Sequence, residues 1–163
     1  MEAAEFRNEV IGQTVSHVWR GFGTAIFLEL GRLRERGPRK DGSKRNPEGD
    51  ISVMIEWSWR IERPKSILGG SFSSERKFLG MLEKFSGATI TDMAVTSGLP
   101  ELILSFSNGL KLSSYMTAEG QPSWAIITRR PNLGTLYVQR GKLLVESTPN
   151  ISFDADAQAR RST

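Results

Sequence analysis

The stretch SWRIERPKSILGG, residues 58–70, has a counterpart in SWAIITRRPNLGT, residues 123–135, later in the same chain. Both stretches begin with Ser-Trp, have an isoleucine two residues later (Ile61 and Ile126), and then reach an Arg-Pro pair and Leu-Gly. A proline ends a strand because it cannot donate to a β-ladder. We therefore expect one strand in each half of the chain, with Trp59 and Trp124 in the core rather than at a binding surface.

The similarity extends outward from this stretch, in the same order in both halves. Gly12-Gln13-Thr14 resembles Gly87-Ala88-Thr89, 75 residues later, and the apolar alternation at residues 26–30 recurs at residues 102–106. At the Ser-Trp pairs the offset falls to 65 residues, so the first copy carries an insertion. A repeated order of this kind predicts an internal duplication. The alternative is a set of similar strands without a common origin.

These offsets define the expected domain organisation. We predict a single domain, residues 1–149, made of two pseudo-repeats at about 10–71 and 85–147. The insertion corresponds to residues 32–50, and residues 150–163 form a flexible tail. A small β unit cannot bury its apolar face alone, whereas two copies packed together can, so the repeat has a structural explanation that requires no active site.

The remaining patterns indicate the fold class. Alternation from Ile51 to Glu62, with Trp57 on the apolar face, predicts one long half-buried strand. Helical spacing of apolar residues predicts a helix over Ser73–Phe85, and residues 2–10 favour a short N-terminal helix. The Asn108-Gly109 dipeptide is a strong hairpin signal, and Arg140-Gly141 is a weaker one. We expect an α+β fold with a mainly antiparallel sheet built from two related halves.

The composition is that of an ordinary globular protein, with 38% apolar and 9% aromatic residues. No uninterrupted apolar run is longer than that at residues 25–28, which is far too short to span a membrane. The absence of cysteine excludes disulfides, thiolate metal sites and a cysteine nucleophile, and it fits a reducing compartment. We expect a cytoplasmic protein with no membrane partner.

Catalytic patterns are weak. His17 is the only histidine, so no second histidine or cysteine completes a metal-ligand set, and the G-x-S-x-G elbow of serine hydrolases is absent. Glu56, Ser58, Arg60 and Glu62 are expected on one solvated strand face. Carboxylates six residues apart on a strand are about 20 Å apart, too far for a pair that acts within roughly 10 Å. We expect no catalytic residues, no metal and no cofactor.

The insertion is the strongest functional candidate. Residues 32–50 lack periodicity, are rich in glycine, proline and charge, and are expected to form a long exposed loop. They carry four acids, Glu35, Asp41, Glu48 and Asp50, and no aromatic residue. The candidate partner- or nucleic-acid-binding residues are Arg32, Arg34, Arg36, Arg39, Lys40, Lys44 and Arg45. Such cations can contact phosphates without sequence specificity, whereas the lack of aromatics disfavours stacking on bases.

The second half also carries a resemblance. Leu102 to Phe106, the Asn108-Gly109 turn and the Ser123-Trp124 pair together resemble small bacterial β-rich domains of uncharacterised function. Some of these are similar to immunity proteins, which bind and block a partner toxin. The resemblance implies a protein-binding role and transfers no site residues. Immunity proteins aimed at nucleases tend to be acidic, whereas this chain has a net charge of +4.

We therefore expect a non-catalytic protein that binds and modulates a partner protein, in the manner of an immunity protein or inhibitor. The alternative is nucleic-acid binding through the loop at residues 32–50. A small hydrolase-like enzyme is the second alternative. The sequence leaves self-association open.

Overall fold

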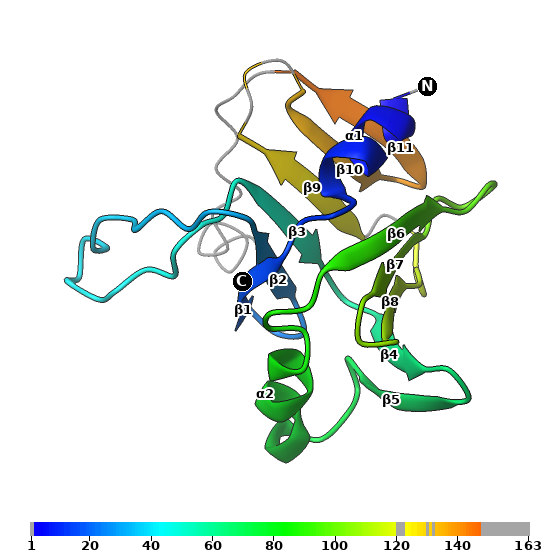
Figure 1. The fold of residues 1–163 in the computed structure, drawn as a ribbon, viewed down its shortest axis with the longest axis horizontal. Helices are drawn as coiled ribbons and strands as arrows, with labels where there is room; N and C mark the ends of the chain where they lie inside the picture. The colour runs from blue at the N-terminus through cyan, green and yellow to red at the C-terminus, as the bar shows by residue number, and fades with distance from the viewer. Residues whose placement is uncertain (1, 120–122, 130, 132, 148–163) are drawn as a thin grey trace.

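The computed structural model describes residues 2–119, 123–129, 131 and 133–147 (Figure 1). The helices are α1 (Glu2–Val10) and α2 (Glu75–Glu83). The strands are β1 (Val15–Arg20), β2 (Ile26–Leu30), β3 (Ile51–Ile55), β4 (Trp59–Arg63), β5 (Ser66–Gly70), β6 (Ile90–Val95), β7 (Leu102–Phe106), β8 (Lys111–Ser114), β9 (Trp124–Thr128), β10 (Thr135–Gln139) and β11 (Lys142–Glu146). Within this described part, no helix is both long and apolar enough to cross a bilayer.

The strands form two sheets, and every pairing between neighbouring strands is antiparallel. One sheet has the order β1-β2-β3-β9-β10-β11, and the other has the order β5-β4-β8-β7-β6. Buried residues of both sheets and both helices join in one apolar core. The β-rich α+β fold predicted from the sequence is confirmed, with two sheets in place of one and both expected helices present.

The two halves of the chain exchange strands. The first half contributes β1-β2-β3 to the six-stranded sheet and then crosses to the other sheet with β4 and β5. The second half does the reverse: β6-β7-β8 lie in the five-stranded sheet, and β9 and β10 cross to the first (Figure 1). Each sheet therefore contains strands from both halves.

The buried tryptophans make the same contact in each half. The Trp59 indole Nε1 donates to the Thr24 backbone carbonyl at 2.7 Å, and the Trp124 Nε1 donates to the Pro100 carbonyl at 2.8 Å. Thr24 and Pro100 each lie two residues before a strand, β2 and β7 respectively. Both indoles are buried, so a lost partner would leave a polar group without water. The predicted core position of both tryptophans is confirmed.

The junction between the halves repeats as well. The Gly12 N–H donates to the Ile90 carbonyl, and the Gly87 N–H donates to the Val15 carbonyl, each at 2.8 Å. A register shift follows Val15 in β1 and Ile90 in β6. Equivalent contacts thus recur in both halves, and their origin in a duplication stays a prediction. One sequence match does not correspond in space: Gly69 lies within β5, whereas Gly134 precedes β10 with a φ of 75°.

Each helix packs on the other half of the chain. Helix α1 contacts β6 and β10, whereas α2 contacts β1. The Arg7 guanidinium of α1 donates to the Met93 carbonyl at 3.1 Å and to Asp92 at 2.7 Å, both in β6. Because β1 and β6 are edge strands, the helices that lie against them limit pairing with other chains. Leu79, one of the apolar residues whose spacing predicts α2, is exposed.

The Arg7–Asp92 pair gives a prediction for the pH dependence of stability. The hydrogen bond from Arg7 lowers the pKa of Asp92 below its ordinary value. A carboxyl with a lowered folded-state pKa contributes stability above its unfolded pKa and loses it as pH falls through the folded value. Asp92→Asn should therefore unfold at a slightly lower temperature at neutral pH. This difference should begin to shrink as pH falls to about 4, the ordinary pKa of an aspartate, and should vanish only below the lowered pKa of the folded state. Thermal unfolding from pH 7 to pH 2 measures it; a difference independent of pH would contradict the assignment.

The strand predicted over residues 51–62 is wrong in its length. The chain leaves the six-stranded sheet after Ile55 and enters the five-stranded sheet at Trp59, and Trp57 between them has a φ of 62°. A positive φ reverses the extended course of the backbone, so the alternation does not describe one strand. Trp57 is exposed, whereas Glu56 and Ser58, expected in solvent, are buried.

Candidate binding arm and the polar network at its base

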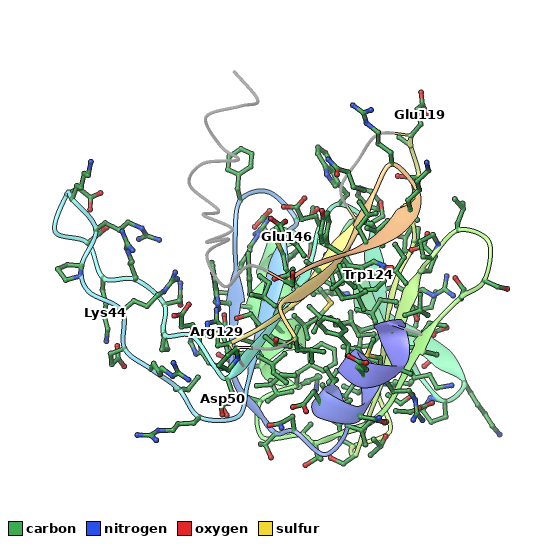
Figure 2. All side chains as sticks on the ribbon, turned by 90° about the horizontal axis from the view of Figure 1, so that it is seen from above. Lys44, Asp50, Glu119, Trp124, Arg129 and Glu146 are labelled. Atoms are coloured by element: carbon green, nitrogen blue, oxygen red, sulfur yellow. The ribbon has the colours of Figure 1, made fainter. Side chains whose placement is uncertain are left out.

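Residues 32–50 connect β2 to β3 and are called here the basic arm. The equivalent link in the second half, between β7 and β8, is a short turn at Asn108-Gly109. The arm extends away from both sheets as the long cyan loop of Figure 1. Figure 2 shows Lys44 far out on the arm, with Asp50 and Arg129 at its base and Trp124 within the body of the protein. The inserted segment thus projects from the fold.

The arm has more internal structure than the sequence predicts. The Arg34 N–H donates to the Glu48 carbonyl at 2.8 Å, and the Glu48 N–H donates back at 3.0 Å. Near the tip, the Arg39 N–H donates to the Ser43 carbonyl at 2.9 Å. The hydroxyl and backbone N–H of Ser43 donate to the Asp41 carboxylate and lower its pKa. These contacts give the arm the form of a hairpin.

The seven predicted cations fall into two groups. Arg34 lies 3.5 Å from Asp50, the Arg36 Nε donates to the Asn46 carbonyl at 2.9 Å, and Arg39 donates to the Lys44 carbonyl at 3.2 Å. These three arginines therefore stabilise the arm itself. Within the described part of the chain, the other four make no side-chain hydrogen bond or ion pair: Arg32, Lys40, Lys44 and Arg45.

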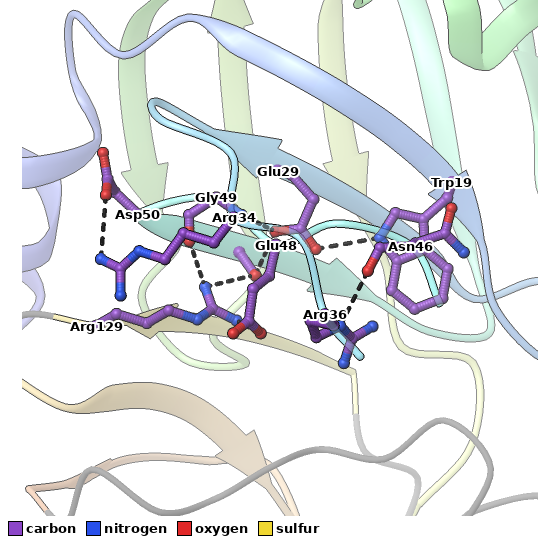
Figure 3. Close-up of polar contacts among 10 residues, drawn as sticks. Trp19, Glu29, Arg34, Arg36, Asn46, Glu48, Gly49, Asp50 and Arg129 are labelled. Carbon is purple, nitrogen blue, oxygen red and sulfur yellow. Dashed lines mark hydrogen bonds and ion pairs between the residues drawn. The ribbon is translucent and has the colours of Figure 1, made fainter. Parts of the chain in front are cut away.

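Glu29 lies at the centre of the network at the base of the arm (Figure 3). It belongs to β2, and only 2% of its surface is exposed. Its carboxylate accepts hydrogen bonds from the Trp19 indole Nε1 at 3.1 Å, from the Gly49 N–H at 3.0 Å and from the Ser52 hydroxyl. A buried carboxylate is costly unless its oxygens are hydrogen-bonded. These three donors meet that requirement and fix the end of the arm against β2.

Arg129 closes the network from the other half of the chain. It follows β9 directly and donates to the Gly49 carbonyl at 2.8 Å, to the Ser52 hydroxyl at 2.9 Å and to Glu48 at 2.8 Å. Gly49 is required at this point because a Cβ there would lie 2.3 Å from the Leu30 carbonyl oxygen. The returning limb of the arm is therefore held by groups from both halves.

A second contact holds the arm from β1. The His17 Nε2 lies 2.9 Å from the Asn46 side-chain oxygen. The only histidine of the chain thus contacts the arm. Comparison of the chain with protein-family models, with curated proteins and with solved structures found no match.

The chemistry of the network is that of a structural clamp. The Ser52 hydroxyl donates a hydrogen bond to Glu29 and accepts one from Arg129. It is therefore not positioned as a free nucleophile. His17 contacts Asn46 rather than this serine. No group of three metal-ligating side chains lies together in the described residues. The network can hold the arm in one direction.

The sequence indicated the cations of the arm but not the polar network that holds its base. Trp19, Glu29, Ser52 and Arg129 come from four separate strands or strand ends, and no local pattern connects them. One signal was present: Glu29 is the single acid in the apolar run from Ala25 to Leu30. A charge in a buried strand needs hydrogen-bonding partners elsewhere in the fold, although the sequence does not say which residues supply them.

Proposed function

We propose that this chain is a non-catalytic binding protein whose basic arm contacts an acidic surface on a partner protein. The observation that carries the proposal is the projecting, anchored arm with four unpaired cations, Arg32, Lys40, Lys44 and Arg45. Because the arm is clamped at its base, less conformational entropy is lost when it binds. Binding and modulation of a partner, as by an immunity protein or inhibitor, fits this arrangement.

The composition of the arm favours a protein over a nucleic acid. Glu35 and Asp41 lie among the cations and would repel phosphates. No aromatic side chain on the arm is available for stacking on a base. Nucleic acid is nevertheless the second candidate, because four unpaired cations on a projecting segment can contact successive phosphates.

The test is a charge reversal at the arm tip with a matched control. Lys40→Glu, Lys44→Glu and Arg45→Glu together should weaken binding of the partner at least about tenfold, since complementary charge governs both encounter and specificity. The control carries the same change of charge elsewhere, at Arg63→Glu, Lys65→Glu and Lys84→Glu, and should bind like the wild type. Partners captured by the wild type in native lysate are identified, purified and titrated against all three proteins.

The outcomes separate the candidate functions. A partner that binds the arm variant and the control equally well would contradict the role of the arm. Fluorescence anisotropy with a labelled DNA and a labelled RNA oligonucleotide tests the second candidate. Binding that weakens steeply with salt and disappears only in the arm variant would establish nucleic acid as the partner.

A further inference from the structure

The two sheets that the structure describes end in four edge strands, β1 and β11 in one sheet and β5 and β6 in the other. An edge strand presents N–H and C=O groups that can pair with another chain. In the described part of the chain, three of these edges are engaged by the protein itself, whereas β11 is not. Figure 1 shows β11, in orange, at the outer rim of the six-stranded sheet.

Contacts between the halves of the chain occupy β1 and β6. The Val15 N–H of β1 donates to the Ala88 carbonyl, and the Gly87 N–H donates to the Val15 carbonyl, each at 2.8 Å. The Ile90 N–H of β6 donates to the Gln13 carbonyl at 2.9 Å. The start of each strand is therefore hydrogen-bonded outside its own sheet, and a helix lies against each strand.

The edge of β5 is blocked by the residues that follow it. Gly70, the last residue of β5, donates its N–H to the Ser73 hydroxyl at 3.0 Å. The Ser73 N–H donates back to the Gly70 carbonyl at 3.0 Å. The pairing of β5 with β4 also shifts in register after Ile61, and such irregularities limit further pairing at a sheet edge.

The geometry of the last hairpin directs two residues of β11 outward. Its two-residue turn, Arg140-Gly141, has φ values of 52° and 73°, as in a type I′ turn. Gln139 lies opposite Lys142, and this pair closes the turn by a hydrogen bond. Hydrogen-bonded pairs alternate along an antiparallel ladder. Leu143 and Val145 therefore direct their N–H and C=O groups away from β10.

The outward side of β11 has the properties of an open pairing edge. Among the described residues, none outside the hairpin forms a hydrogen bond with the backbone of Leu143 or Val145. Both side chains are half-buried and pack against the main core. Leu144, on the opposite face, is 37% exposed. The centre of β11 thus has three consecutive apolar residues, without the charge or proline that protects many edges.

We propose that β11 pairs antiparallel with β11 of a second copy of this chain, which joins the two six-stranded sheets into one. The two-fold axis passes through Leu144. Leu143 then lies opposite Val145 of the second copy, and each such pair exchanges both of its N–H···O bonds. The same surface is used on both sides, so the assembly closes as a dimer.

The charges of β11 favour a second copy in this register. The strand begins with Lys142 and ends with Glu146, so the two-fold axis places each lysine opposite the glutamate of the other copy. Opposite charges across a strand pair stabilise it, whereas like charges destabilise it. Glu146 also has a contact within its own chain, and a carboxylate with two oxygens can accept from Lys142 as well. An unrelated strand would match this pattern only by chance.

The dimer leaves room for the neighbouring helices and for the basic arm. Helix α1 contacts β10, and three strand spacings place the two copies of β10 about 14 Å apart. Packed helices need only about 8–10 Å between their axes. The arm joins β2 to β3, several strands away from β11. The dimer would therefore carry two accessible arms, which raises the apparent affinity for a partner with repeated acidic sites.

The first test introduces a single cysteine, because the chain has none. The two copies of Leu144 form a non-hydrogen-bonded pair, whose Cα atoms lie about 4.5 Å apart, within the range for a disulfide. On mild oxidation, Leu144→Cys should form a linked dimer at least about tenfold faster than Ile67→Cys, because pairing holds the thiols together. Ile67 is an exposed control position on β5. Non-reducing gel electrophoresis measures the rates.

The second test measures the dimer without a covalent link. In sedimentation velocity, the wild-type dimer should increase with concentration, because pairing of five-residue strands buries less area than a standard interface. Leu144→Lys and Lys142→Glu each place like charges opposite one another and should weaken the dimer at least about tenfold. Lys65→Glu makes the same charge change in the exposed β4–β5 turn and should dimerise like the wild type. Thermal unfolding checks that each variant is folded.

Each outcome decides the proposal. Faster oxidation of Leu144→Cys and a dimer weakened by both β11 charge variants would support it. A wild type that stays monomeric at every concentration would overturn it, whether the last residues of the chain or a strand of another protein covers the edge. So would a dimer that both charge variants leave intact, or equal oxidation of Leu144→Cys and Ile67→Cys. These measurements do not use the partner of the arm, so this proposal and the proposed function fail independently.

Discussion

Trp59→Ala should lower the free energy of unfolding by about 3–5 kcal/mol, the range for removing a large aromatic side chain from a packed core. The Trp59 side chain is fully buried and meets the Phe78 ring edge-on, with 5.4 Å between the centroids. The substitution leaves a cavity between the two sheets and α2. It also leaves the Thr24 carbonyl without its indole donor. Urea denaturation followed by circular dichroism measures the effect.

Matched variants separate the contribution of core packing from that of the indole hydrogen bond. Trp124→Ala should be similarly destabilising, because Trp124 occupies the equivalent buried position and bonds the Pro100 carbonyl. Trp59→Phe keeps much of the packing and should cost less, chiefly the price of an unsatisfied carbonyl, about 1–3 kcal/mol. Trp57→Gly is the exposed control. A loss below about 1 kcal/mol for Trp59→Ala would mean that the core does not depend on this ring.

Glu29→Ala should lower the free energy of unfolding by about 2–4 kcal/mol, because it leaves buried donors without an acceptor. The donors are the Trp19 indole, the Gly49 N–H and the Ser52 hydroxyl. The loss should be concentrated at the base of the arm. Hydrogen exchange should therefore accelerate at the amides of Gly49 and of the neighbouring Arg34–Glu48 bridge, while the five-stranded sheet keeps its protection.

Two controls test this assignment. Glu29→Gln keeps the size and one acceptor oxygen but directs an amide N–H toward a donor, so an intermediate loss is expected. Glu48→Gln weakens the ion pair with Arg129, which is partly exposed, and should cost less than about 1 kcal/mol. If Glu29→Ala denatured like the wild type and exchange at Gly49 were unchanged, the arm would be held by other contacts.

The local features of the fold were readable from the sequence because each depends on neighbouring residues. Asn108-Gly109 predicted the β7–β8 turn, and Gly109 has a φ of 84° that glycine tolerates. Helix α2 and the buried Trp59 followed from spacing and from comparison of the two halves. The single strand predicted across Trp57 failed, because alternation does not show where a chain passes from one sheet to another.

The functional candidates also differ in whether neighbouring residues alone could predict them. Lys40 and Lys44 could be placed on an exposed segment from local charge and glycine content alone. The clamp of Glu29 by Ser52 and Arg129 could not, since its members meet only after β2, β3 and β9 have paired. The exposure of Trp57 was missed because Trp57 continues an apolar alternation, whereas its backbone has a positive φ at the crossing between the sheets.

The exchange of strands between the halves has a consequence for synthesis of the chain. Strand β3 pairs with β9 through contacts such as Val53 with Ile126, so its second neighbour is made much later. At roughly 5–20 residues per second on a ribosome, the delay lasts on the order of several seconds. Throughout it, β3 is an apolar strand with one open edge, a form prone to pairing with other chains. The stage most exposed to aggregation therefore comes before β9 has emerged from the ribosome.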